Sequence, residues 1–134
     1  MTTSICGYLI DPFEQEISEV KLFTKLVKDP DFGEFYDLES INTIYELIKC
    51  GIFTAARVYP NNDIIYVDDM GLLQHDQHYF LHSGYNSPLA GRGLLLGTGN
   101  FGESISPATP IETVKEDITW LGNVASLHSK LHGI

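Results

Sequence analysis

Apolar residues recur every three or four positions between Leu38 and Ile48, which is the spacing of one face of an α-helix. We therefore predict a helix over residues 38–49. Asp37 stands at its N-cap position, where a carboxylate can accept from free backbone N–H groups. Gly51 follows the helix, at a position that favours a left-handed residue. Both ends of this helix are marked in the sequence.

Residues 52–59 and 64–68 are rich in β-branched and aromatic side chains and flank Pro60-Asn61-Asn62-Asp63, a composition typical of a reversal. This pattern predicts a β-hairpin that ends in a second turn at Asp69-Met70-Gly71. Short apolar segments predict further strands at 4–10, 79–81 and 94–96, and a brief return strand at 103–106. The partial alternation of residues 14–23 favours a strand, although it also permits a helical turn.

Two further helices are expected. A short one is predicted over Lys21–Asp29, before breaks at Pro30 and Gly33. A C-terminal helix is predicted to begin with Thr109 as the cap and Pro110 as its first residue. Helical spacing is shared by Ile111, Val114, Ile118, Leu121 and, after an interruption at Gly122-Asn123, by Val124, Leu127 and Leu131.

These elements predict one α+β domain over residues 1–134, in which a mainly antiparallel sheet carries the central helix and the C-terminal helix. The strands are joined by turns that are too short for parallel crossovers. An open sheet edge in so small a domain makes a homodimer plausible.

Charge narrows the classes of partner. Lys and Arg number 8 against 18 Asp and Glu, which gives a net charge of −10. Such a chain repels nucleic-acid phosphates and anionic membranes, so we expect no direct nucleic-acid binding and no membrane partner. The ordinary explanation of this negative charge is that it keeps the protein soluble. The more specific explanation is a surface that imitates DNA.

The apolar segments are too short to span a bilayer, and the N-terminus lacks the layout of a signal peptide. We therefore expect a cytoplasmic protein of the host cell. Cys6 and Cys50 are expected to be reduced packing residues rather than a disulfide.

Four segments, SINTIYELIKCGIFTAARV, DIIYVDDMGLL, PLAGRGLLLGTGNFGES and IETVKEDITWL, resemble a family known only as a domain of unknown function. This family occurs mostly in bacteriophages, plasmids and their hosts. The resemblance spans residues 37–121, and the segment 20–36 is longer than the family leads us to expect. The shared motifs are turns and glycines beside strands, so they imply a shared fold and bring no reaction and no assigned active residues.

Gly97-x-Gly99-x-x-Gly102 has the spacing of a dinucleotide-binding fingerprint and follows a predicted strand. That motif works only where a helix opens at its end, and the residues 103–107 that follow cannot form one. We interpret the glycines as a β-turn and expect no cofactor.

Histidines are candidate metal ligands. His75, His78 and His82 with Asp76 could gather around a divalent ion, but a strand would separate His75 from the other two, and a polar exposed stretch is the simpler interpretation. The pair His128 and His132, four residues apart, is explained without a ligand by the favourable position of cations at a helix C-terminus. We assign no metal site.

The best candidate for a ligand site is the loop of residues 84–93. Arg92 lies there between two glycines, and its planar guanidinium could clamp a carboxylate or phosphate, with Tyr85 and Asn86 adding contacts. Asp68 and Asp69 could join it as cation ligands or an acid/base pair. The alternatives are turn residues for the aspartates and an internal salt bridge for Arg92, for instance with Asp68 or Asp69.

Familiar enzyme signatures are absent from the sequence, so an enzyme is the less favoured class. The leading hypothesis is a non-enzymatic accessory protein of a phage or mobile element that binds a host protein or a small ligand. The alternatives are an acidic DNA-mimic inhibitor of a defence or DNA-processing enzyme, and a metal-dependent hydrolase that uses the histidine-rich stretch.

Overall fold

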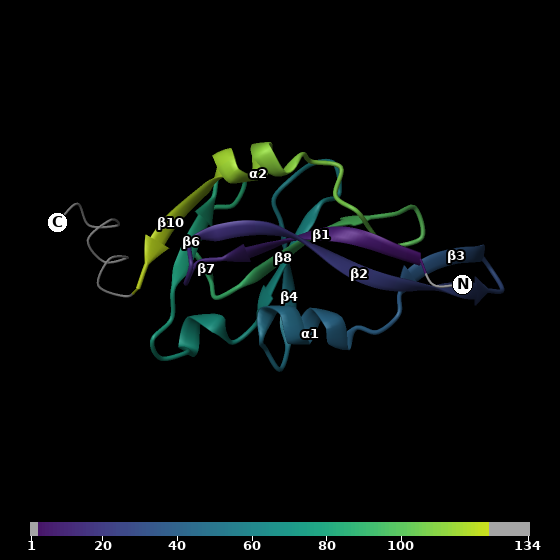
Figure 1. Ribbon diagram of the computed structural model, residues 1–134, viewed down its shortest axis with the longest axis horizontal. Coiled ribbons are helices and arrows are strands. Elements are labelled where there is room, and N and C mark those ends of the chain that lie inside the picture. The colour runs from purple at the N-terminus through teal and green to yellow at the C-terminus, as the bar shows by residue number, and fades with distance from the viewer. Residues whose placement is uncertain (1–2, 124–134) are drawn as a thin grey trace.

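The computed structural model describes residues 3–123, in which an antiparallel sheet runs in the order β3, β2, β1, β8, β5, β4, with β9 paired to β8 (Figure 1). A second sheet has the order β10, β6, β7. The strands are β1 Thr3–Asp11, β2 Glu16–Asp29, β3 Gly33–Leu38, β4 Phe53–Arg57, β5 Ile64–Asp68, β6 Tyr79–His82, β7 Leu89–Ala90, β8 Gly93–Thr98, β9 Ser104–Ile105 and β10 Ile118–Gly122. The helices are α1 Asn42–Ile48, α2 Ile111–Asp117 and the short 3-10 helix η1 Gly71–Leu73. The mainly antiparallel α+β class predicted from the sequence is confirmed at this level.

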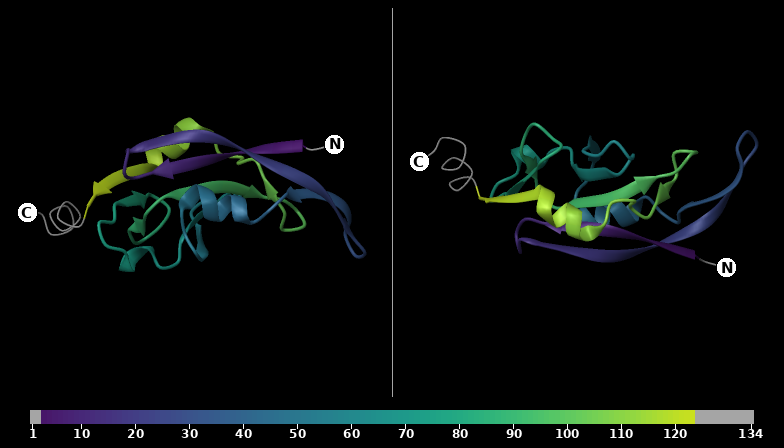
Figure 2. Two further views of the ribbon diagram at one scale, coloured as in Figure 1. Left: turned by 60° about the horizontal axis from the view of Figure 1, so that its bottom comes forward. Right: turned by 90° about the horizontal axis from the view of Figure 1, so that it is seen from above.

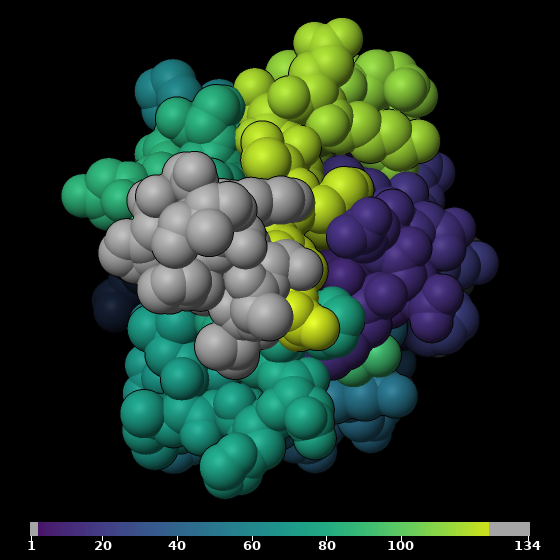
Figure 3. Space-filling view, turned by 90° about the vertical axis from the view of Figure 1, so that its left-hand side faces the viewer, coloured from purple at the N-terminus to yellow at the C-terminus, as the bar shows by residue number. Residues whose placement is uncertain are grey.

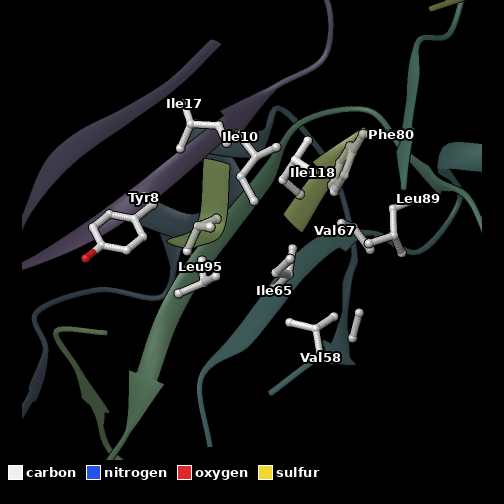
Figure 4. Close-up of a cluster of buried hydrophobic side chains, with 12 residues drawn as sticks. Tyr8, Ile10, Ile17, Val58, Ile65, Val67, Phe80, Leu89, Leu95 and Ile118 are labelled. Carbon is white, nitrogen blue, oxygen red and sulfur yellow. The ribbon is translucent and has the colours of Figure 1, made fainter. Parts of the chain in front are cut away.

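Strand β8 is buried on both faces, as its aliphatic run predicts. Leu94 and Leu96 point to the side covered by α1, where they pack with Leu22, Ile44 and Ile48. Leu95 points to the opposite side and packs in a larger core that joins the two sheets (Figure 4). That core includes Tyr8, Ile10, Ile17, Ile65, Val67, Phe80, Leu89 and Ile118. All three leucines of β8 are 0% exposed.

Two glycines allow close packing around β8: Gly7 lies in the neighbouring strand β1, and Gly93 is the first residue of β8 itself. A Cβ atom on Gly7 of β1 would lie 2.8 Å from Leu96 Cδ2, and one on Gly93 would lie 2.9 Å from Ile65 Cγ2. Distances this short do not occur between real side-chain carbons, so a Cβ at either position would force a neighbouring side chain to move.

The two predicted hairpins are confirmed. Strands β4 and β5 pair antiparallel, from Phe53 with Asp68 to Arg57 with Ile64. The glycine-rich segment after β8 turns the chain into β9, and the Gly99 N–H donates to the Glu103 carbonyl at 2.8 Å. The turn, rather than a phosphate-binding loop before a helix, is therefore the local structure of this motif.

The predicted helix over 38–49 is wrong at its beginning, because α1 begins only at Asn42. Leu38 instead ends β3, where it pairs with Thr24. The Asp37 carboxylate, predicted as the cap, accepts the backbone N–H of Leu38 at 2.8 Å and that of Ser104 at 3.0 Å. The hydrogen bond to Ser104 of β9 therefore takes the Asp37 carboxylate away from the predicted capping role.

The left-handed residue at the end of α1 is Lys49, with φ 54°, rather than Gly51. Ile44 and Ile48 of this short helix cover the β8 face that carries Leu94 and Leu96.

The predicted strand over 14–23 is confirmed, but the helix predicted over Lys21–Asp29 is wrong. Strand β2 continues to Asp29, because its first part pairs with β1 and its second part pairs with β3. The paired segment of residues 24–38, named the arm, extends away from the rest of the molecule (Figure 2). Phe32 at its tip is 59% exposed and packs against Phe101.

The C-terminal helix is shorter than predicted. Helix α2 ends at Asp117, and Ile118–Gly122 form β10, which pairs with β6 and places Trp120 opposite Phe80. The three-residue spacing of Ile118 and Leu121 is helical, but pairing with β6, with a register shift between Trp120 and Gly122, makes this segment a strand. The predicted continuation through Val124, Leu127 and Leu131, and the His128 and His132 pair, lie outside the described residues.

Cys6 and Cys50 are free thiols. Among residues 3–123, no helix has the length and apolar character that a membrane span needs.

A buried carboxylate ties the β4–β5 turn to the segment before α2. Asp63 is 1% exposed, and it accepts the backbone N–H groups of Ala108 at 3.1 Å and of Thr109 at 2.8 Å. The Thr109 hydroxyl donates to the same carboxylate at 2.6 Å. Thr109 is therefore engaged with Asp63, and the residue flanking α2 is Pro110 rather than the predicted Thr109.

Asp63→Ala should destabilise the protein, because it leaves buried donors of residues 108 and 109 without a partner. We expect the free energy of unfolding in urea to fall by about 3 kcal/mol. The matched control is Asp31→Ala at the exposed tip of the arm, which should change it by less than about 0.5 kcal/mol. Equal effects of the two substitutions would show that the Asp63 contacts contribute nothing particular.

Candidate functional site

The five residues singled out by the sequence do not form one site. Arg92 and Asp68 line a hollow of about 230 Å³, named the Arg92 groove. Asp68, Asp69 and Tyr85 line a smaller hollow of about 150 Å³, named the β4 hollow. Asn86 is exposed and lines neither of them. Asp68 therefore lies between two separate candidate sites.

The Arg92 groove is built from segments far apart in the sequence. Its walls are Phe13 of the β1–β2 turn, Ile48 and Lys49 at the end of α1, Asp68 at the end of β5, residues 74–77, and Gly91 with Arg92. Figure 3 shows the β1–β2 turn (purple) and residues around 70–80 (teal) at the same end of the molecule.

Arg92 is held in place by two contacts within the chain. Its Nε lies 3.4 Å from Asp11 Oδ2, and its Cζ lies 4.7 Å from the centre of the Phe13 ring. Asp11 also accepts the Phe13 N–H at 2.9 Å, so one carboxylate closes the β1–β2 turn and orients the guanidinium. The predicted alternative, an internal salt bridge, is present, but its partner is Asp11 and not one of the suggested examples, Asp68 and Asp69.

One wall follows from the way α1 ends. Lys49 adopts a left-handed conformation, and the next N–H, of Cys50, donates to the Tyr45 carbonyl at 3.2 Å. This closure is common at helix C-termini. It leaves Lys49 exposed on the rim of the groove.

Another wall of the groove is held by a buried amide. Gln77 is 6% exposed, and its Nε2 donates to the Gly71 carbonyl at 2.9 Å. The residues before it, Gln74, His75 and Asp76, are exposed on the rim. The groove therefore carries both signs of charge together with amide groups.

An adjoining shallow depression of about 520 Å³ shares Lys49, Asp68 and Gln74 with the Arg92 groove. Its own lining includes Ile52 and Met70, which are 61% and 48% exposed. The polar groove thus continues into a more apolar surface.

The histidine-rich stretch is split among three surroundings. His75 lines the Arg92 groove, the His78 ring packs 4.7 Å from the Phe13 ring, and His82 is buried. In the part of the chain that the structure describes, no three His, Cys, Asp or Glu side chains are grouped to hold a metal ion.

His82 belongs to a polar cluster that sequence reasoning missed. Its Nδ1 accepts the Gly84 N–H at 2.9 Å, which places the proton of the neutral ring on Nε2. Nε2 is buried without a hydrogen-bond partner and lies 4.0 Å from Asp117 Oδ2. The Tyr59 ring packs edge to face against the imidazole, with 4.7 Å between the ring centres.

Asp117 is the centre of this cluster. It accepts the Tyr59 hydroxyl at 2.6 Å and the Ser83 hydroxyl at 2.9 Å. The Tyr59 hydrogen bond holds the pKa of Asp117 below its ordinary value, and burial followed by this same bond raises the pKa of Tyr59. Burial lowers the pKa of His82, and the charge of Asp117 opposes that change only in part. Through Asp117, the cluster connects the end of α2 with Ser83, which follows β6, and with Tyr59.

The lowered pKa of His82 makes stability depend on pH. Unfolded His82 takes up a proton near its ordinary pKa of 6.5, whereas the folded ring takes one up only at lower pH. The free energy of unfolding should therefore fall as the pH is lowered through 6.5 toward the folded pKa. Urea unfolding of wild type and His82→Gln at about pH 7.5 and pH 5.5 measures this, and the variant should show the smaller difference.

The matched control is His75→Gln, whose side chain is exposed on the groove rim and which should keep the pH dependence of the wild type. If His82→Gln kept the full pH dependence of the wild type, the buried imidazole of His82 would not be the source of that dependence.

No family model matches the chain, and neither a curated protein nor a solved structure shows significant similarity to it. The resemblance to the phage and mobile-element family therefore stays a prediction.

Proposed function

We propose that this chain is a non-enzymatic accessory module, of the kind expected for a phage or mobile element, that binds a small ligand in the Arg92 groove inside the host cell. The observation that carries the proposal is the composition of the groove. Five segments of the chain meet there and bring Lys49, Arg92, Asp68 and Asp76 to one hollow.

The charges favour a ligand that carries both signs. Lys49 can attract an anionic group, while Asp68 and Asp76 can attract an ammonium group. Arg92 already faces Asp11, so its main role is to hold the wall and the Phe13 ring in place. The amides of Gln74 and Gln77 add hydrogen-bonding groups.

The size of the groove points to a small molecule. A hollow of about 230 Å³ lies below the range of drug-sized sites, which begins near 300 Å³. A free amino acid or a dipeptide meets both requirements, because each carries an ammonium and a carboxylate group on a small skeleton.

The DNA-mimic alternative is supported by the net charge of −10 alone. On the arm, cations alternate with carboxylates: Lys28 Nζ lies 4.0 Å from Glu34 Oε1, and Lys25 is paired across the strands with Asp37. Such alternation differs from an array of phosphates, so it favours the ligand-binding proposal for this part of the surface.

A panel of the free amino acids and of simple dipeptides tests the proposal. We expect at least one of them to raise the melting temperature and to shift the amide NMR signals of residues 48–49, 74–77 and 91–92. Lys49→Ala and Asp76→Ala, both at exposed rim positions, should weaken binding about tenfold each, because each removes one charge partner.

The matched controls are Lys115→Ala and Asp31→Ala, which remove the same charges outside the groove and should leave binding unchanged. A panel in which no compound binds, or a bound compound that shifts signals only elsewhere, would overturn the proposal.

A further inference from the structure

The outer edge of β4 is a second surface that can bind a partner. β4 is the last strand of the main sheet, and no described strand pairs with its outer side. The Asp69 N–H donates to the Ile52 carbonyl at 2.9 Å, just outside the ladder in which Phe53 faces Asp68. In an antiparallel ladder, hydrogen-bonded and non-hydrogen-bonded pairs alternate. The backbone groups of Phe53, Ala55 and Arg57 therefore point away from β5.

Apart from Arg57 at its end, which is exposed and cationic, the side chains of this edge do little to block it. Natural sheets protect their edges with lysine, proline, bulges or a covering segment. β4 instead carries Thr54, Ala55 and Ala56, which are small, and Thr54 and Ala55 are exposed.

The strand at the other end of the main sheet, β3, presents a more protected edge. There β3 carries Glu34 and Asp37, and the Leu38 N–H is already used by the Asp37 side chain. Compared with β3, β4 is therefore the edge strand that is more open to a further strand.

The β4 hollow lies beside this edge and has a mixed character. Val67, Leu72 and Leu89 supply apolar walls, and Tyr85, Asp68 and Asp69 supply polar groups. The hollow of about 150 Å³ can accept one long side chain. An aliphatic stem fits its walls, and a cationic head fits its carboxylates.

We propose that an extended, basic segment of a partner protein adds to the sheet at β4 and places a Lys or Arg side chain in the β4 hollow. The backbone groups of Phe53, Ala55 and Arg57 form the new ladder, and alternate side chains of the segment face the hollow, as in other cases of strand addition. The net charge of −10 draws a basic segment toward this surface.

Charge also argues against a second copy as the occupant, although the open edge would otherwise suit a homodimer. Two chains of net charge −10 repel each other, and pairing two β4 strands would bring two sets of Asp68 and Asp69 near one interface. This surface is independent of the ligand proposed for the Arg92 groove and shares only Asp68 with it.

The test uses the full chain and fluorescently labelled peptides in which valine alternates with lysine. Fluorescence anisotropy should show saturable binding, and the same peptide with glutamate in place of lysine should not bind. Ala55→Pro removes the outward N–H at the centre of the edge and should weaken binding about tenfold, whereas Ala55→Val keeps it and should stay within about twofold. Asp69→Asn should weaken the lysine peptide about fivefold, because one carboxylate of the hollow is lost.

A lysine peptide with N-methyl groups on alternate residues tests the same ladder in the unmodified protein, so the result does not depend on the folding of Ala55→Pro. N-methylation in the ladder register should abolish binding. Equal binding of the lysine and glutamate peptides, no effect of N-methylation, or no binding at millimolar peptide would each overturn the proposal. Light scattering that shows a dimer, with Ala55→Pro monomeric, would assign the edge to a second copy and overturn it as well.

Discussion

The burial of β8 on both faces is the constraint on which the rest of the structure depends. Leu94 and Leu96 enter the core under α1, and Leu95 enters the core between the two sheets. β8 pairs with β1 on one side and with β5 on the other, and Gly7 and Gly93 leave room for the Leu96 and Ile65 side chains. Arg92 directly precedes this strand, so a fully buried segment of the sheet positions it.

The elements that the sequence predicts well are those whose signal is local. The run Leu94–Leu96 is short, aliphatic and flanked by glycines, as in a buried strand, and the turn residues 60–63 mark a hairpin by their composition. The wrong predictions lie where contacts with residues distant in the sequence decide the local structure. Asp37 has the composition of a helix cap, but Ser104 recruits its carboxylate, and residues 118–121 pair with β6 instead of continuing α2.

The candidate site shows the same division. Arg92 could be identified because it is an isolated cation between two glycines, yet its partner Asp11 lies 81 positions earlier and nothing near either residue announces the pair. The hydrogen bond between Tyr59 and Asp117 joins residues 58 positions apart, and no local sequence pattern predicts it either. The outward backbone groups of β4 depend on the order of strands in the sheet, which no periodicity encodes.

The arm has a consequence for the behaviour of the protein in concentrated solution. Leu26, Phe32 and Tyr36 stay 43%, 59% and 44% exposed on this hairpin, where they form apolar patches that attract other molecules. Electrostatic repulsion between copies of net charge −10 opposes that attraction, and it has a range of only about 8 Å in physiological salt and about 3 Å in molar salt. The net negative charge thus keeps the molecules apart in solution, and the range of this repulsion decreases as the ionic strength rises.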